Sequence, residues 1–160
     1  MQYIRHIQTP LGGVTLAGDG TSLCGLWFDG QIHFPRNLVG CEAALPVFEE
    51  TARWLDVYFR GEEPDFLPPL SPQGTPFQAA VWRCLTEIPY GETVTYGALA
   101  ARLGRPRAAQ AVGGAVARNP ISLLIPCHRV LGASGALTGY AGGLWRKEAL
   151  LALERGQAGR

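Results

Sequence analysis

The chain has 160 residues, of which 47% are hydrophobic and 17% are charged, and its formal net charge at neutral pH is +1. This composition is typical of one ordinary or two small folded domains and argues against intrinsic disorder. No run of 18 apolar residues occurs and the N-terminus has no apolar signal-peptide core, so we expect neither a membrane span nor secretion.

Four cysteines, at positions 24, 41, 84 and 127, are spaced too widely and too irregularly for a disulfide framework or a C-x-x-C zinc site. A reducing, intracellular location fits this cysteine pattern best. We expect the cytoplasm of a bacterial or archaeal cell. In the N-terminal half, Cys24 with His33 is too small a set of ligands for a metal ion. We therefore expect no bound metal.

Charge is divided unevenly along the chain. Residues 1–75 hold 4 Lys+Arg and 9 Asp+Glu, a net charge of −5, whereas residues 76–160 hold 10 and 4, a net charge of +6. A nucleic-acid-binding domain joined to a scaffold domain has this asymmetry. A chance division of a nearly neutral chain is the alternative explanation.

The first part of the chain predicts a small antiparallel sheet with one helix. Residues rich in β-formers alternate with glycine- and proline-bearing turns, which predicts strands at 3–9, 14–17 and 23–28. Apolar residues then recur at helical spacing from Glu42 to Phe59, with Pro46 suited to the first turn and Gly61 to the end. We expect this helix to cover one face of the sheet.

Residues 62–74 contain four prolines, which are unfavourable in regular structure and are typical of a linker. The sequence therefore predicts an N-terminal α/β scaffold domain over residues 1–74. The second domain is then predicted over residues 75–160.

The second domain begins with strong helix-start signals. Thr75 and Gln78 can form a capping box, and Pro76 suits the first helical position. Trp82 and Cys84 are expected to pack in the core of this domain. The predicted apolar stripe of the helix is Phe77, Val81, Leu85 and Ile88.

A pair of short helices follows. Thr95 can cap a helix with apolar Leu99 and Leu103, residues 104–106 form a glycine-bearing turn, and a second helix is predicted over 107–118. This is the arrangement of a helix-turn-helix. Helix pairs with such turns are also common in proteins that do not bind DNA.

The second helix of this pair has an unusually smooth face. Ala109, Gly113 and Ala117 lack the polar side chains that read base edges, so we expect close approach to a minor groove rather than base-specific major-groove contacts. The stripe expected to be buried is Ala108, Val112 and Val116. The basic residues available for phosphates are Arg105, Arg107 and Arg118.

The motif Pro126-Cys127-His128-Arg129-Val130 follows an apolar run, residues 121–124, that is predicted to be buried and extended. A thiolate is a strong nucleophile and forms readily beside a positive or proton-accepting group. Neighbours in sequence point in different directions, so a water rather than direct contact is expected between Cys127 and His128. A structural cysteine and a cysteine hydrolase are the alternatives.

With Asn119-Pro120 before it and Thr138-Gly139-Tyr140 after it, this motif resembles the active-site signature of the O6-alkylguanine-DNA alkyltransferases. The resemblance runs from about Thr75 to Gly156 and more loosely through the N-terminal half. It implies an α+β fold, with a small antiparallel sheet and helix of the ribonuclease H-like type. A mostly helical, winged-helix-like domain with a helix-turn-helix would follow.

The resemblance assigns catalytic roles position by position. It implies that Cys127 is the nucleophile and that His128 draws the thiol proton, with Glu154 orienting the imidazole. Asn119 would tie the recognition helix to the active-site segment. Arg129 is expected to brace the site by hydrogen bonds.

The resemblance also assigns residues to the substrate base. Tyr96 would crowd the 3′ phosphate and contact the flipped base, and the Val130 carbonyl would accept a hydrogen bond from the guanine amino group. Tyr140 and Ala141 would belong to the loop that closes over the base. Many relatives have serine where this chain has Ala141, so only the backbone donor is kept.

The last segment predicts a glycine-rich loop and a helix. Residues 132–143 hold several glycines, which implies a tightly turned or mobile loop. A helix is predicted from about Trp145 to Arg155 and is ended by Gly156. Its inward positions are Leu150, Leu151 and Leu153.

Taken together, the resemblance implies a single-use transfer of an alkyl group from O6-alkylguanine, and from O4-alkylthymine, to Cys127 after base flipping. The partner is expected to be double-stranded DNA, bound as a monomer without sequence preference or cofactor. The family usually has an arginine that fills the space left by the flipped base; Gln110 stands there. The alternatives are a non-catalytic alkylated-base-binding relative, which would lack the cysteine, and a helix-turn-helix transcription regulator.

Overall fold

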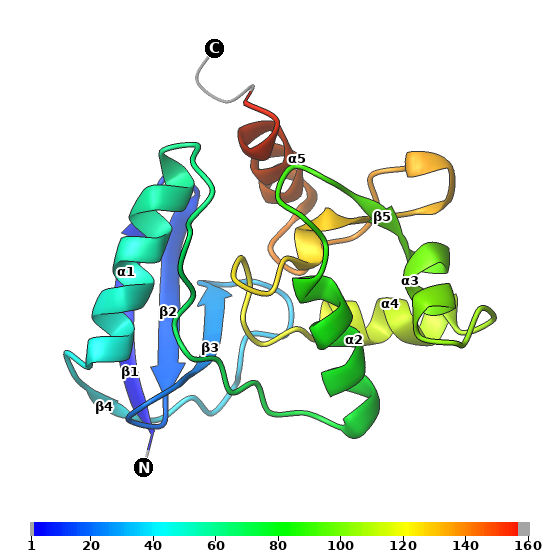
Figure 1. The fold of residues 1–160 in the computed structure, drawn as a ribbon. Helices are drawn as coiled ribbons and strands as arrows, with labels where there is room; N and C mark the ends of the chain where they lie inside the picture. Colours follow the sequence, from blue (N-terminus) through cyan, green and yellow to red (C-terminus); the bar gives the residue numbers. More distant parts are fainter. Residues whose placement is uncertain (1, 157–160) are drawn as a thin grey trace. The chain divides into compact units, whose positions relative to one another are not determined.

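The computed structural model describes residues 2–156, and their contacts divide the chain into two compact units (Figure 1). The first unit holds the chain up to Gln73 together with Pro120–Ser122. The second holds Gly74–Asn119 and continues from Leu123. The fold class is α+β, as predicted: a sheet with one helix, then a mostly helical unit. The segment 120–122 had been placed in the second domain and instead belongs to the first unit.

The sheet of the first unit has the strand order β3-β2-β1-β4. The three predicted strands are confirmed as an antiparallel meander, although β2 is longer than predicted: β1 Tyr3–Thr9, β2 Gly12–Gly18 and β3 Leu23–Phe28. The short strand β4, Cys41–Glu42, pairs parallel with β1. Glu42 therefore lies in a strand, and the prediction that it begins the helix was wrong.

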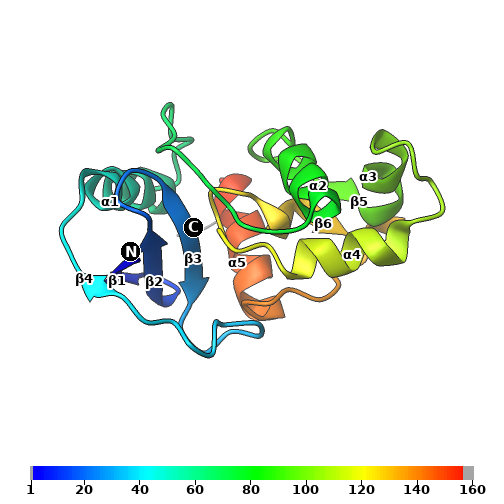
Figure 2. The same cartoon turned by 90° about the horizontal axis from the view of Figure 1, so that it is seen from below.

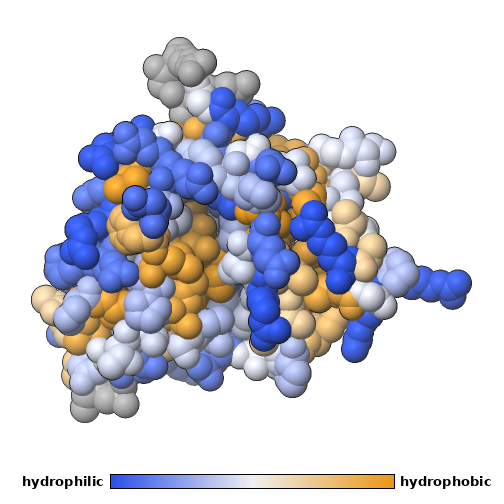
Figure 3. All heavy atoms as spheres, in the orientation of Figure 1, coloured by the Kyte–Doolittle hydropathy of each residue, from blue (hydrophilic) through white to orange (hydrophobic). Residues whose placement is uncertain are grey.

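Helix α1, Pro46–Phe59, packs against β1 and β2 on one face of the sheet (Figures 1 and 2). Pro46 stands in the first turn and Gly61 follows the end with φ of 85°, as the sequence indicated. Hydrophilic side chains are the more numerous over this helix, at left in Figure 3, with some hydrophobic ones among them. The side chains that it buries are Val47, Phe48, Thr51, Trp54, Leu55 and Tyr58.

Two segments add to β3 by backbone hydrogen bonds. Leu23 donates to Pro69 O at 2.8 Å and accepts from Ser71 N at 2.8 Å. Leu26 donates to Pro120 O at 2.8 Å, and its carbonyl accepts from Ser122 N at 3.0 Å. The end of the predicted linker is thus docked on the sheet. Pro69 and Pro120 can take part in this pairing because only their carbonyl oxygens are needed, as acceptors.

The second unit contains α2 Pro76–Thr86, α3 Tyr96–Arg102, α4 Ala109–Ala117 and α5 Leu144–Glu154. A two-stranded parallel sheet joins β5, Val94–Thr95, to β6, Val130–Leu131. The capping box is confirmed: Gln78 N donates to Thr75 Oγ1 at 3.1 Å, and Thr75 N donates to Gln78 Oε1 at 3.0 Å.

The core of the second unit joins α2 to α4. The Trp82 side chain is buried and donates from Nε1 to Ala115 O at 2.9 Å. Cys84 is only half-buried, so its predicted place in the core was wrong. Helix α4 packs against both α2 and α3.

The predicted helix pair is present with corrected bounds. Thr95 caps α3 by accepting from Ala98 N at 3.0 Å. Helix α4 begins at Ala109, because Arg107 belongs to the preceding turn. Val112 and Val116 are buried as predicted, whereas Ala115 takes the place expected for Ala108. No helix within residues 2–156 is both long and apolar enough to cross a membrane.

Replacing Thr75 by Ala removes one half of the capping box and leaves the Gln78 N–H without its side-chain acceptor. We expect a loss of about 1 kcal/mol in the free energy of unfolding, measured by urea denaturation. The matched control is Thr93→Ala, at an exposed threonine that caps no helix. An equal loss in both variants contradicts the role given to the cap.

Candidate active site

Cys127 begins a short 3₁₀ turn, Cys127–Arg129, that leads into β6. The segment before it is buried, as predicted, but it is not extended: residues 122–125 form turns and bends, and Leu123 has a φ of 73°. A non-glycine residue is held in that left-handed region only by its surroundings. The 3₁₀ turn packs against α2 and α5, so the backbone of the thiol is fixed by two helices.

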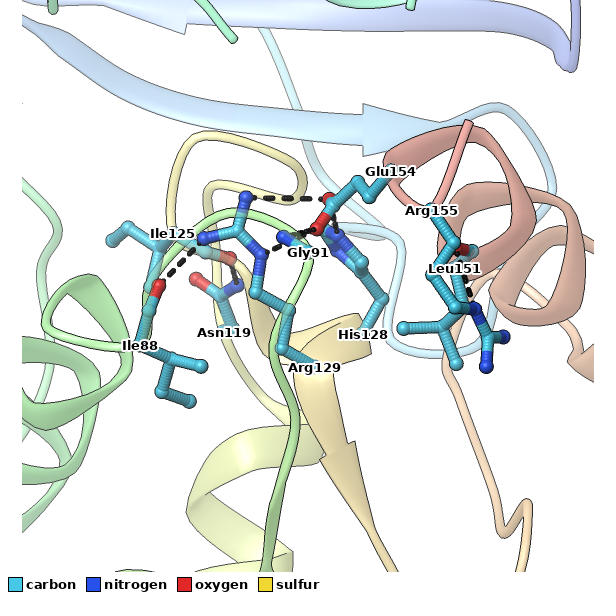
Figure 4. Close-up of polar contacts among 9 residues, drawn as sticks. All are labelled: Ile88, Gly91, Asn119, Ile125, His128, Arg129, Leu151, Glu154 and Arg155. Carbon is cyan, nitrogen blue, oxygen red and sulfur yellow. Dashed lines mark hydrogen bonds and ion pairs between the residues drawn. The ribbon is translucent and has the colours of Figure 1, made fainter. Parts of the chain in front are cut away.

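A single buried carboxylate organises this turn (Figure 4). Glu154 Oε2, at the end of α5, lies 2.5 Å from His128 Nε2, and the Glu154 side chain is 1% exposed. Arg129 donates to the same carboxylate from Nε at 2.8 Å and from Nη2 at 3.2 Å. The backbone N–H of Gly91 donates to Glu154 Oε1 at 3.1 Å. Sequence reasoning had not found the Gly91 contact.

His128 is fully buried, and its burial lowers the pKa of the imidazole even though Glu154 acts to raise it. The ring is therefore neutral at pH 7. A carboxylate can only accept, so the proton between the two groups lies on Nε2. The Nδ1 atom then carries a lone pair, which makes His128 a proton acceptor rather than a donor.

Arg129 makes hydrogen bonds to two separate segments of the second unit. Besides Glu154, it donates from Nη1 to Ile88 O at 2.7 Å, and its guanidinium lies over the ring of Tyr90, 5.7 Å from the centroid. The guanidinium thus joins the end of α5 to the loop after α2. All three nitrogens of the guanidinium donate hydrogen bonds to protein atoms.

Cys127 as a whole residue is 6% exposed, and burial raises the pKa of its thiol. Hydrogen bonds from the side chains of Asn119 and Tyr140, and the charge of Lys147, act in the opposite direction. Asn119 also donates from Nδ2 to Ile125 O at 2.8 Å. The structure therefore brings Asn119, at the end of α4, to the cysteine segment, where the family resemblance had placed it.

The residues assigned to the substrate base come from α3, from β6 and from the loop before α5. Tyr96, at the start of α3, has its pKa raised by burial and, to a smaller extent, by Cys127, whereas a hydrogen bond with the Thr138 side chain acts to lower it. A Cβ on Gly113 of α4 would lie 3.7 Å from the Tyr96 ring. Val130 is fully buried in β6. Ala141 follows Tyr140 in the loop before α5 and is half-buried.

The residues assigned to DNA lie on or beside α4 of the second unit. Gln110 and the arginines at positions 105, 107 and 118 are exposed on or beside α4. Ala109 and Gly113 are half-buried on the same helix. The guanidinium of Arg105 lies over the ring of Phe77, 5.4 Å from its centroid. The second unit thus presents an α4 surface with small side chains and basic residues near its ends.

Sequence reasoning missed Lys147 of α5. Its side chain is fully buried and its Nζ donates to Thr138 O at 2.9 Å. A signal was present in the sequence, because this is the only lysine in the chain. Among residues 2–156, no group of three or more His, Cys, Asp or Glu side chains could hold a metal ion.

Comparison with known proteins gives consistent matches over both halves of the chain. Residues 76–156 match the model of the 6-O-methylguanine DNA methyltransferase DNA-binding domain. Residues 3–72 match that of the 6-O-methylguanine DNA methyltransferase ribonuclease-like domain.

Curated relatives and solved structures agree with these matches. The methylated-DNA–protein-cysteine methyltransferase of Methanosarcina acetivorans is 48% identical over 95% of this chain and 97% of its own length. The Mycobacterium leprae protein of the same name is 47% identical, covering 98% and 94%. The crystal structure of Mycobacterium tuberculosis OGT in complex with DNA matches with a TM-score of 0.89 and 45% identity, over 98% of this chain and 94% of that one.

Replacing Glu154 by Gln tests the carboxylate as the centre of the site. The neutral amide leaves the Arg129 guanidinium buried without its counter-charge, so we expect a loss of about 3–5 kcal/mol in the free energy of unfolding. Urea denaturation measures it. Glu148→Gln, at an exposed glutamate of the same helix, is the control and should change stability by less than about 0.5 kcal/mol. Similar losses of unfolding free energy in the two variants would contradict the central structural role given to Glu154.

Proposed function

This chain belongs to the 6-O-methylguanine DNA methyltransferase family, and we propose that it repairs O6-alkylguanine in DNA by moving the alkyl group to the sulfur of Cys127. The environment of the Cys127 thiol is the observation that supports Cys127 as the alkyl acceptor. It is buried beside a neutral histidine, which the Glu154 carboxylate holds in one orientation. Among residues 2–156, the other cysteines are half-buried or exposed.

Burial of the thiol requires the substrate base to leave the duplex. The target carbon of O6-alkylguanine lies inside the base stack, where no side chain can attack it in line with the bond that breaks. Cys127 lies in a turn packed against α2 and α5 and does not protrude from the protein. The nucleotide must therefore rotate out of the helix and bring the alkyl carbon to the sulfur.

The transfer is a direct displacement at carbon. His128 Nδ1 takes the thiol proton; because Cys127 and His128 are consecutive in a 3₁₀ turn and point in different directions, a water carries it. The thiolate attacks the alkyl carbon, a C–S bond forms, and the C–O6 bond breaks with its electron pair going to the base. Proton return to the base gives guanine. The product thioether has no good leaving group, so each molecule reacts once.

The surrounding residues receive roles that fit their positions. Asn119 and Tyr140 favour the thiolate by hydrogen bonds. Tyr96, whose ring lies next to Gly113 of α4, would contact the flipped nucleotide. The backbone groups of Val130 and Ala141 would recognise the base edge. Alkylated thymine presents the same O-alkyl carbon and is a second substrate.

We assign DNA binding to the surface of α4, as a monomer on double-stranded DNA. The small residues Ala109 and Gly113 suit close approach to a minor groove, and Gln110 is exposed on this helix and would enter the duplex. Arginines 105, 107 and 118 would contact phosphates. Base-edge readers are not needed, because the lesion occurs in any sequence. The relatives come from bacteria and archaea, whose DNA lies in the cytoplasm, and we place the reaction there.

The acceptor is tested by mixing the protein with a duplex that contains one O6-methylguanine and measuring the intact protein mass. We expect one added methyl group per protein molecule, located on Cys127 by peptide mapping. Cys127→Ser should accept none, whereas Cys41→Ser, at an exposed cysteine, should react as the wild type does. Many lesions repaired per molecule, or an unmodified Cys127, would refute the proposal.

The glutamine at position 110 predicts weaker duplex insertion than an arginine there would give. Gln110→Arg adds charge and reach, so we expect tighter binding to duplex DNA and faster methyl transfer by about tenfold or less, as one new phosphate or base contact allows. Rates are measured by single-turnover quench. Ala111→Arg adds the same charge at the next exposed position of α4 and controls for charge alone. Equal rates and affinities for Gln110→Arg and the wild type remove the claim.

A further inference from the structure

Arg105 lies in the turn between α3 and α4, and the way in which α3 ends fixes its backbone. Gly104 has a φ of 72° and donates from its N–H to Ala101 O at 3.0 Å. The N–H of Arg105 donates to Ala100 O at 3.0 Å. These two hydrogen bonds form a Schellman motif, which closes a helix at a left-handed glycine. The position of Arg105 relative to α3 is therefore set by the helix end itself.

The residues that follow Arg105 restrict its backbone further. Pro106 disfavours the α-helical conformation for the residue before it. The carbonyl of Arg105 accepts from Ala108 N at 2.9 Å, and Ala108 is the N-cap of α4. The backbone of this arginine is thus tied to both helices of the pair.

A ring from a third helix holds the Arg105 side chain. The guanidinium carbon lies over the ring of Phe77, 5.4 Å from its centroid, and Phe77 stands in the first turn of α2. The capping box between Thr75 and Gln78 fixes that turn. Phe77 is half-buried, whereas Arg105 is exposed. A guanidinium at this distance is attracted to the face of an aromatic ring. Both the backbone and the side chain of Arg105 are therefore held by other parts of the second unit.

The charge of Arg105 is not neutralised by the protein. Among residues 2–156, no ion pair of 4.0 Å or less involves this side chain. The ring of Phe77 attracts the cation but supplies no negative charge to it. A long basic side chain loses rotamer freedom when it contacts a phosphate, and a side chain that is already held loses less. An exposed, held and unpaired guanidinium is therefore suited to an anionic partner.

We propose that Phe77 is a positioning residue for DNA binding: its ring holds the Arg105 guanidinium in the orientation that contacts a DNA phosphate. The inference rests on the proposed function, because Arg105 belongs to the surface that is assigned there to DNA. It extends the DNA-binding machinery to α2, which lies outside the helix pair. The ring acts on DNA through Arg105 alone.

The affinity for a fluorescein-labelled duplex without a lesion tests this role, because no methyl transfer accompanies binding. Phe77→Leu keeps an apolar side chain on α2 and removes the ring. We expect about two- to fivefold weaker binding by fluorescence anisotropy, which is the contribution of an exposed cation–π pair. Phe77→Tyr keeps the ring and should restore the wild-type affinity. Equal losses of affinity in the leucine and tyrosine variants would overturn the proposal.

The phosphate contact of Arg105 is tested by the dependence of affinity on salt. Arg105→Gln removes one cation, so the slope of log K against log salt concentration should fall in magnitude by about one. An unchanged slope would show that Arg105 contacts no phosphate, and it would overturn the inference even if other arginines of the surface bind DNA.

A double-mutant cycle tests whether Phe77 acts through Arg105. In the Arg105→Gln background, Phe77→Leu should cause no further loss of affinity, because the side chain that the ring holds is absent. The matched control is Arg118→Gln, which removes a cation from the opposite end of α4 and should leave the effect of Phe77→Leu at full size. A loss that persists in the Arg105→Gln background would show a structural role only and overturn the proposal. Failure of the wild type to bind any duplex would instead overturn the proposed function.

Discussion

The buried carboxylate of Glu154 is the constraint on which the rest of the site depends. It accepts from His128, from two nitrogens of Arg129 and from the backbone of Gly91. These donors come from the 3₁₀ turn and from the loop after α2, so one side chain at the end of α5 joins three segments. Because a buried charge is tolerated only when it is paired and hydrogen-bonded, the same contacts that orient His128 also hold the unit together.

Burial of Cys127 disfavours ionisation of its thiol, and several neighbouring side chains favour it. Burial raises the pKa of Cys127. It also keeps bulk water away from the sulfur, so the thiolate does not have to lose a hydration shell before it attacks. Asn119, Tyr140 and Lys147 act against the effect of burial from three different elements. Dipoles and charges that are already in position stabilise a developing charge most effectively.

Features that depend on residues a few positions apart could be predicted from the sequence. Pairing between distant segments could not. The capping box at Thr75 and the glycine after α1 depend on residues a few positions apart, so their patterns were sufficient. Strand β4 has two residues and pairs parallel with β1, which no alternation could indicate. The turn before Cys127 depends on Leu123 in a left-handed conformation. The apolar composition of residues 121–124 had instead indicated an extended segment.

The candidate site divides in the same way. The motif around Cys127 and its family resemblance named Glu154, whereas periodicity alone would have left it on the surface of a helix. The contact from Gly91 spans 63 positions in sequence and involves only backbone, so no residue type marks it. The burial of Lys147 follows from how the loop at 138–139 lies over α5, and its rarity in the composition was the one visible sign.

The central claim is that Glu154 holds His128 as a neutral base with its proton on Nε2. Nitrogen-15 NMR of the imidazole rings measures it directly, because the chain has three histidines and substitution of His6 and His33 assigns their signals. At pH 7 the account predicts a neutral His128 ring with a protonated Nε2 and an unprotonated Nδ1. An imidazolium at that pH, or a neutral ring with its proton on Nδ1, would contradict it.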